Sequence, residues 1–230
     1  MEEELNMIAH MDPKSPFVEA YRMLRTNLQF SQVDKKLQTI AITSATPNEG
    51  KSTVITNLAI VLAQAGNKVL VIDCDFRNPT QHKNFKCSNR SGFSNCIANH
   101  SDIHECLQKT QIEHIDIITG GPIPPNPSEL LGSKQVQGVL DGLKQEYHYI
   151  LIDTPPIMPV TDAVIVGAKA DGVIMVVEYG AIPPSLLKEA KERLNSPSIN
   201  ILGAVLSKVE VNNGSGYGYG YGYYHYYGRE

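Results

Sequence analysis

The chain has 230 residues, of which 42% are hydrophobic and 19% charged, and its 20 basic and 24 acidic residues give a formal net charge of −4. This composition is typical of a soluble protein with one substantial core and argues against a nucleic-acid partner. The longest apolar stretch, 58–65, is far shorter than the roughly 20 residues that cross a bilayer. The acidic N-terminus, MEEEL, is unlike a secretory signal, so we expect a cytoplasmic protein.

The first predicted element is an amphipathic helix over about residues 15–30. Apolar residues run from Phe17 through Tyr21 to Leu28 at the spacing of a helix with one apolar face. Ser15 is the predicted cap, and Pro16 stands in the first turn.

Beyond this helix, short β-branched runs alternate with helical patterns. The alternation predicts an α/β fold of the phosphate-loop NTPase type, with a mainly parallel sheet covered by helices on both faces. The expected strands are 39–43, 68–73, 115–119, 149–153, 172–178 and 201–207, and the expected helices are 52–65, 133–147, 160–168 and 185–195. The polar stretch 76–114, with a short helix near 92–98, is expected to lie over the sheet and not within it.

Residues 45–53, ATPNEGKST, form a predicted phosphate-binding loop between the first strand and the next helix. Backbone N–H groups and the positive helix end would cradle the phosphates, while Lys51 reaches the β and γ oxygens and Ser52 coordinates Mg²⁺. The common pattern has glycine at position 45, where this chain has alanine; the change matters only if the backbone there needs a positive φ. The residues expected to bind the nucleotide are Asn48, Glu49, Gly50, Lys51, Ser52 and Thr53.

Three carboxylates stand at the ends of two further predicted strands. Asp73 and Asp75 end VLVIDCD, and Asp153 ends YILID. Because ligands bind at the carboxyl edge of such sheets, all three should face the phosphates. We expect Ser52, Asp75 and Asp153 to hold Mg²⁺, and Asp73 to orient and deprotonate an incoming hydroxyl.

Four cysteines, Cys74, Cys87, Cys96 and Cys106, form no CxxC pair. The spacing favours structural free thiols in a reducing compartment. An iron–sulfur cluster shared between two subunits is the weaker alternative.

The C-terminal segment is a low-complexity run of tyrosine and glycine. Seven of the 11 tyrosines fall in the last 14 residues: Tyr217, Tyr219, Tyr221, Tyr223, Tyr224, Tyr226 and Tyr227. Such a segment has no apolar face, so we expect a single domain over 1–211 and a disordered tail over 212–230. About 20 flexible residues have a root-mean-square reach of roughly 25 Å.

These motifs together resemble the BY-kinases, the bacterial tyrosine kinases of capsular and extracellular polysaccharide synthesis, and among them the CapB-like cytoplasmic chains. The resemblance covers nearly the whole chain and rests on ATPNEGKST, VLVIDCDFR, ILIDTPP, PPNPSELL and the tyrosine cluster. It implies an ATP- and Mg²⁺-dependent protein-tyrosine kinase that phosphorylates its own tail between subunits. The catalytic residues implied are Lys51, Asp73, Asp75 and Asp153.

Glu19, Arg22 and Arg25 match the E-x-x-R-x-x-R helix of that family. Taken alone they are typical of a solvated charged face, whereas the resemblance implies a ring interface between subunits. The resemblance also implies a transmembrane chain-length regulator of the CapA type, which would recruit the kinase to the inner face of the cell membrane and activate it. Other proteins of polysaccharide synthesis are implied as possible further substrates.

Two other functions stay open. Partition- and division-site ATPases carry a signature lysine five residues before the loop lysine, where this chain has Thr46, and this difference argues against that class. The second alternative is a non-enzymatic nucleotide-binding scaffold of an export complex, which only an activity assay distinguishes from a kinase.

Overall fold

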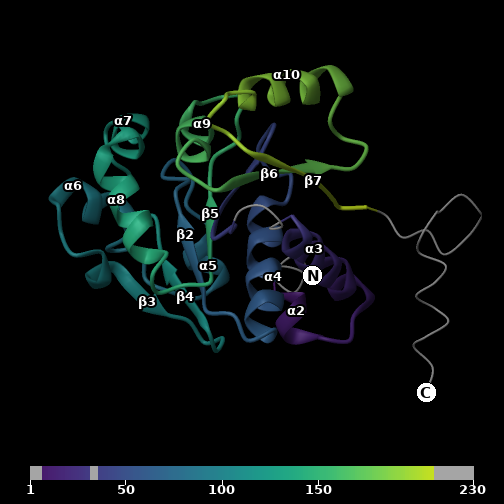
Figure 1. The fold of residues 1–230 in the computed structure, drawn as a ribbon, viewed down its shortest axis with the longest axis horizontal. Helices are drawn as coiled ribbons and strands as arrows, with labels where there is room; N and C mark the ends of the chain where they lie inside the picture. The colour runs from purple at the N-terminus through teal and green to yellow at the C-terminus, as the bar shows by residue number, and fades with distance from the viewer. Residues whose placement is uncertain (1–6, 32–35, 210–230) are drawn as a thin grey trace, which may run out of the picture.

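The computed structural model describes residues 7–31 and 36–209, which form one sheet between two layers of helices (Figure 1). The strand order is β3-β4-β2-β5-β1-β6-β7; β3 is antiparallel to β4, and every other pair is parallel. The strands are β1 (Thr39–Ser44), β2 (Val69–Asp73), β3 (Leu107–Lys109), β4 (Ile115–Ile118), β5 (Tyr149–Asp153), β6 (Gly172–Glu178) and β7 (Ile201–Ser207). The predicted mainly parallel α/β sheet is confirmed.

Helices cover both faces of the sheet, as predicted. One layer holds α2 (Ile8–Met11), α3 (Pro16–Phe30), α4 (Lys51–Gln64) and the short α5 (Gln81–Asn84); the other holds α6 (Phe93–Asn99), α7 (Pro127–Gly132), α8 (Lys134–Leu143), α9 (Asp162–Gly167) and α10 (Pro184–Leu194). Within residues 7–31 and 36–209, none of these helices is long and apolar enough to cross a bilayer.

The central strands are continuous apolar runs because both of their faces are buried. In β1, Ile40 and Ile42 pack against the layer of α4, whereas Ala41 between them packs in the opposite layer. In β5, Leu151 faces α4 and Ile152 faces the other side. Each strand therefore contributes to two apolar cores, and its polar residues are left for the strand ends.

The N-terminal helix begins at Pro16 and ends at Phe30, close to the predicted bounds, but its orientation differs from the prediction. Phe17 is 50% exposed, whereas Val18 and Leu28 are buried against α4. Ser15 stands at the predicted cap position, yet its side chain makes no capping hydrogen bond. The buried stripe is thus displaced by one residue at the first turn, because Val18 and not Phe17 meets α4.

The prediction that residues 76–114 lie entirely outside the sheet is wrong in part. Leu107–Lys109 form the edge strand β3, which pairs with β4 through a register of Gln108 with Ile117. Three residues without a buried side chain give no period-two signal, so sequence patterning missed this strand. The short helix expected near 92–98 is present as α6.

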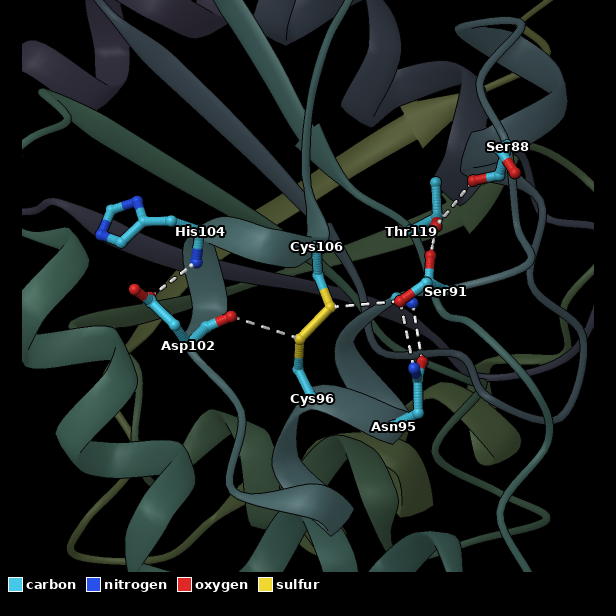
Figure 2. The surroundings of a disulfide bond; sticks show 9 residues. Ser88, Ser91, Asn95, Cys96, Asp102, His104, Cys106 and Thr119 are labelled. Atoms are coloured by element: carbon cyan, nitrogen blue, oxygen red, sulfur yellow. Dashed lines mark hydrogen bonds between the residues drawn. A yellow bond between two sulfur atoms is a disulfide. The ribbon is translucent and has the colours of Figure 1, made fainter.

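The prediction of four free thiols is also wrong. Cys96 of α6 and Cys106, at the end of the 3₁₀ turn Ile103–Cys106, form a buried disulfide whose surroundings are shown in Figure 2. Cys74 and Cys87 are free. A spacing of ten residues does not by itself indicate that two cysteines form a disulfide. The two sulfurs meet because α6 packs against the 3₁₀ turn.

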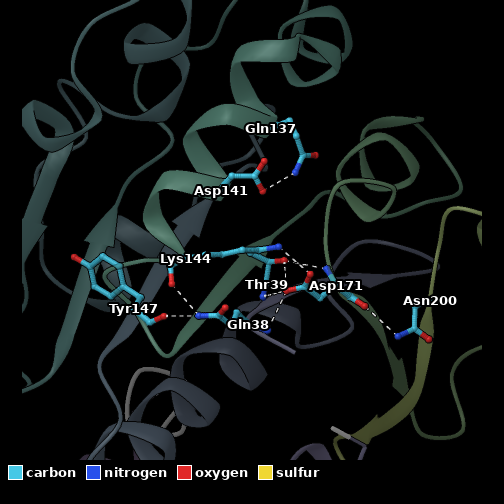
Figure 3. Close-up of polar contacts among 8 residues, drawn as sticks. All are labelled: Gln38, Thr39, Gln137, Asp141, Lys144, Tyr147, Asp171 and Asn200. Atoms are coloured by element: carbon cyan, nitrogen blue, oxygen red, sulfur yellow. Dashed lines mark hydrogen bonds and ion pairs between the residues drawn. The ribbon is translucent and has the colours of Figure 1, made fainter. Parts of the chain in front are cut away.

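A polar cluster at the amino edge of the sheet joins three elements (Figure 3). The Asp171 carboxylate accepts hydrogen bonds from the backbone N–H groups of Gln38 (3.0 Å) and Thr39 (2.8 Å) and pairs with Lys144 at 2.8 Å. Burial alone would raise the pKa of Asp171, but Lys144 and the hydrogen bonds from residues 38 and 39 outweigh it and lower that pKa. The carboxylate thus fixes the start of β1 against the start of β6 and the end of α8.

We expect Asp171→Asn to lower the free energy of unfolding by about 2 kcal/mol at pH 7, because the buried donors lose a charged acceptor. The folded-state pKa lies below the unfolded value of about 3.9, so the contribution is complete above about pH 5 and is lost as pH falls through the folded pKa. Urea denaturation at several pH values measures both effects. Glu189→Gln, which removes the exposed pair with Arg193, is the control and should cost below about 0.5 kcal/mol; equal losses in the two variants would contradict the assignment.

Candidate functional site

The phosphate-binding loop connects β1 to α4 through two residues with positive φ. Asn48 has φ of 66° and Gly50 has φ of 90°, and α4 begins directly after Gly50 at Lys51. Such turns point successive N–H groups into one concavity, next to the positive end of the helix. Ala45 is buried and is not among the residues with positive φ, so the missing glycine does not strain the loop.

Glu49 holds the base of this loop closed. Its side chain is 1% exposed and accepts hydrogen bonds from the N–H and hydroxyl groups of Thr46 and from the N–H of Glu178 at the end of β6. The carboxylate therefore faces away from the concavity, and only the backbone of Glu49 can contribute to phosphate binding. Thr46, at the position of the signature lysine of the partition ATPases, is committed to this contact.

The loop is also tied to the end of β7. The Ser207 hydroxyl donates to the Glu49 carbonyl at 2.5 Å, and Lys208 donates to the Asn48 carbonyl at 2.8 Å while pairing with Glu178 at 2.9 Å. The sequence analysis did not identify Ser207 and Lys208. Their contacts depend on how close β7 lies to the loop in the folded chain, and no local sequence pattern indicates this. β7 thus ends beside the phosphate-binding loop, while the tyrosines at 217–227 lie outside the described residues.

The structure brings the three predicted carboxylates together beside the loop. Asp73 and Asp153 are register partners on β2 and β5, and Asp75 follows two residues after Asp73. Ser52 donates to Asp153 Oδ2 at 3.1 Å, and the Gln81 amide donates to the same oxygen at 2.7 Å. Thus Ser52 and Asp153, predicted from separate motifs as Mg²⁺ ligands, are in direct contact.

The other oxygen of Asp153, Oδ1, is buried without a hydrogen-bond partner. A buried carboxylate oxygen in this state suits a cation, so the donor set fits Mg²⁺. Among residues 7–31 and 36–209, no group of three or more His, Cys, Asp or Glu side chains could hold a metal ion without other ligands. Mg²⁺ commonly takes one or two carboxylates together with substrate phosphates, and this arrangement fits that pattern.

Backbone N–H groups hold the two carboxylates after β2. Asp73 Oδ2 accepts from Thr80 at 2.9 Å and from Gln81 at 3.0 Å, while Asp75 Oδ1 accepts from Asn78 at 3.0 Å. The loop 74–80 therefore turns back over its own strand end. Thr80 and Gln81 are site residues that the sequence did not indicate, since they lie in the stretch predicted to be irregular.

Burial raises the pKa of all three carboxyls, and the charge of Asp153 raises those of Asp73 and Asp75 further. For Asp73, burial and then the charge of Asp153 raise the pKa well above its ordinary value. For Asp75, the same two causes raise it to about 6. For Asp153, burial raises the pKa and the Lys51 ammonium opposes the rise. Three acids around one buried lysine leave an excess of negative charge, which a divalent cation would relieve.

The predicted interface residues on α3 make contacts inside the chain. Glu19 and Arg22 form an ion pair at 2.6 Å, and Arg25 donates to the Val61 carbonyl of α4 at 3.0 Å. Glu19 and Arg22 stay partly exposed, so a contact with another subunit is geometrically open to them.

The chain is similar to known proteins along most of its length. The AAA domain family matches residues 37–185. The tyrosine-protein kinase YwqD of Bacillus subtilis is 42% identical over 210 residues, covering 91% of this chain and 89% of its own. Among solved structures, the chimerical protein CapA2B2 has 41% identity and a TM-score of 0.83, covering 87% of this chain and 88% of its own. The kinase domain of Escherichia coli Etk has 35% identity and a TM-score of 0.87, covering 94% and 84%.

The division-site class is more distant. The septum site-determining protein MinD of Pyrococcus horikoshii is 24% identical with a TM-score of 0.62, covering 74% of this chain and 69% of its own, and this likeness extends to the fold alone. The kinases exceed it in identity, coverage and structural agreement. The chain therefore belongs to the bacterial tyrosine-protein kinases, the BY-kinase family whose motifs its sequence carries, and is a protein-tyrosine kinase.

Proposed function

We propose that this kinase transfers the γ-phosphoryl group of ATP to the tyrosines of its own C-terminal cluster, from one subunit to another, in the control of capsular and extracellular polysaccharide synthesis and export. The observation that supports it best is the gathering of Asp73, Asp75 and Asp153 beside the phosphate-binding loop, with Ser52 in contact with Asp153, at the sheet edge where β7 ends. The nucleotide site and the origin of the tyrosine segment thus share one edge.

Each site residue takes a role that its surroundings favour. N–H groups of residues 48–53 bind the phosphates, and Lys51 neutralises the β and γ oxygens. Ser52, Asp75 and Asp153 hold Mg²⁺, which supplies further neutralisation of the phosphate charge when it is bound.

Asp73 is the group that orients the acceptor phenol and takes its proton. Its pKa is raised by burial and by Asp153, and a general base works best when its pKa approaches the working pH. An unperturbed phenol has a pKa of about 10, but phosphoryl transfer passes through a loose transition state in which positioning matters more than base strength. The N–H groups of Thr80 and Gln81 supply that positioning for Asp73.

We propose that the acceptor segment reaches a neighbouring subunit. Ser207 and Lys208 fix the end of β7 on the loop. The reach of roughly 25 Å expected for a flexible tail of about 20 residues would extend from this point toward a neighbour. Glu19, Arg22 and Arg25 would form the contact between neighbours in a ring.

The membrane partner is proposed from the resemblance and from the name of the CapA2B2 chimera. A CapA-like transmembrane chain-length regulator would bind the kinase at the inner face of the cell membrane and activate it. Other polysaccharide-synthesis proteins are candidate substrates besides the tail.

A mixing experiment tests transfer between subunits. Lys51→Met, which removes the phosphate-binding cation, should carry no phosphotyrosine alone with MgATP and the partner's cytoplasmic segment. Mixed with a wild-type chain that ends at residue 211, it should become phosphorylated, because the truncated chain supplies the active site and the variant supplies the tail. Immunoblotting for phosphotyrosine measures this, with the exposed Lys188→Met as control. Signal from the full-length wild type alone and none from the mixture would contradict transfer between subunits.

The pKa of Asp75 gives a pH test. Because a protonated carboxyl does not bind a metal, the gain in nucleotide affinity that Mg²⁺ provides should fall as pH drops through about 6 and reach its plateau above about pH 7. Titration with a fluorescent ATP analogue between pH 5 and 8, with and without EDTA, measures this gain. Asp75→Asn should remove most of the pH dependence, and a wild-type gain that stays constant from pH 5 to 8 would refute the role of Asp75.

Phosphorylation should reduce the size of the ring. Each phosphotyrosine adds about −1.5 to −2 charge, so a phosphorylated tail would be repelled by the carboxylates of the neighbouring site. Light scattering should show a smaller particle for the phosphorylated protein than for the same preparation after phosphatase treatment. Equal sizes would contradict this mechanism.

A further inference from the structure

A further buried carboxylate, with no role in the site described above, lies near the sheet edge. Asp162, the first residue of α9, is 0% exposed. Its Oδ2 accepts from Arg77 Nε at 3.0 Å, and its Oδ1 accepts from the Ser128 hydroxyl at 2.6 Å. The three residues come from the loop after β2, from α7 and from α9, so one carboxylate joins three separate segments.

The pairing decides where the Arg77 side chain lies. Arg77 lies two residues after Asp75, yet its guanidinium forms an ion pair with Asp162. A fully buried carboxylate costs several kcal/mol unless it is paired and hydrogen-bonded, and here both oxygens have partners. The Arg77 guanidinium is therefore held in place because it compensates the charge of the buried Asp162 carboxylate.

Arg77 stands in the middle of the loop that orients the catalytic acids. The N–H groups of Arg77 and Asn78 bind the Asp75 carboxylate, and the N–H groups of Thr80 and Gln81 bind Asp73. An anchored Arg77 side chain would restrain the backbone on which these donors lie.

We propose that Asp162 is a positioning residue for phosphoryl transfer: together with Ser128 it anchors Arg77 and so holds the loop 74–80 that aims Asp73 and Asp75. The inference rests on the catalytic roles proposed above for Asp73 and Asp75. The proposal also assigns a structural role to the PPNPSELL segment, because Ser128 in that segment donates its hydroxyl hydrogen bond to Asp162.

Asp162→Asn tests the proposal, because the amide keeps the shape and loses the charge. Tail phosphorylation should slow by about tenfold to hundredfold, the range expected when catalytic groups are slightly misplaced. Affinity for a fluorescent ATP analogue in EDTA should change less than about threefold, since the phosphate loop is not part of the contact. Hydrogen exchange at the amides of 77–81 should become faster. Unchanged transfer, or a loss of affinity as large as the loss of rate, would overturn the proposal.

A double-mutant cycle with Arg77→Gln isolates the path of the effect. If Asp162 acts through Arg77, then adding Asp162→Asn to Arg77→Gln should slow transfer by less than about twofold beyond the single variant. Multiplied losses in the double variant would show that Asp162 acts by another route. Glu189→Gln on the surface of α10 is the matched control and should leave both rate and exchange unchanged.

Two milder variants cover the case in which Asp162→Asn does not fold, which thermal melting would reveal. Ser128→Ala and Arg77→Lys should each slow transfer while leaving nucleotide affinity in EDTA intact, and normal transfer in both would overturn the proposal. Failure of the underlying kinase assignment is distinguishable: the wild type would then form no phosphotyrosine in the same assay, while exchange at 77–81 would still report whether Asp162 orders the loop.

Discussion

The site depends on the crowding of three buried carboxylates around a single lysine. Asp73 and Asp153 face each other on adjacent strands, and the charge of Asp153 raises the pKa of both Asp73 and Asp75. Such a cluster is unfavourable in a core unless donors or cations compensate it. The N–H groups of Asn78, Thr80 and Gln81, together with the side-chain amide of Gln81, supply part of the compensation. The negative charge that stays uncompensated would attract the metal ion of a metal–nucleotide complex.

The loop that would receive this complex is held from two directions. The Glu49 side chain accepts a hydrogen bond from the end of β6. Ser207 and Lys208, at the end of β7, donate hydrogen bonds to backbone carbonyls of the loop. A rigid nest keeps its N–H groups directed at the phosphates without reorganisation, which is the usual source of electrostatic stabilisation in phosphoryl transfer.

The sequence was sufficient for the elements and for the acids at strand ends, because both follow from local rules. Apolar runs bounded by Asp73 and Asp153 predict buried parallel strands and place the carboxylates at one edge. Contacts between distant segments have no such rule. Gln81 reaches Asp153, Asp162 captures Arg77, and Cys96 meets Cys106 only after the chain has folded. The apolar face of α3 is a further example. The sequence predicted the helix correctly, but which of its residues are buried depends on how the helix packs against α4.

Few positive side chains are available to balance the carboxylates of the site. Arg77 is committed to Asp162, and Lys208 is committed to Glu178 and to the loop carbonyl. Thr46 stands where the partition ATPases have their signature lysine and is itself held by Glu49. Among the described residues of these segments, Lys51 is therefore the cation whose charge acts on Asp75 and Asp153. A Mg²⁺ ion bound as proposed above would bring the further positive charge that the cluster lacks.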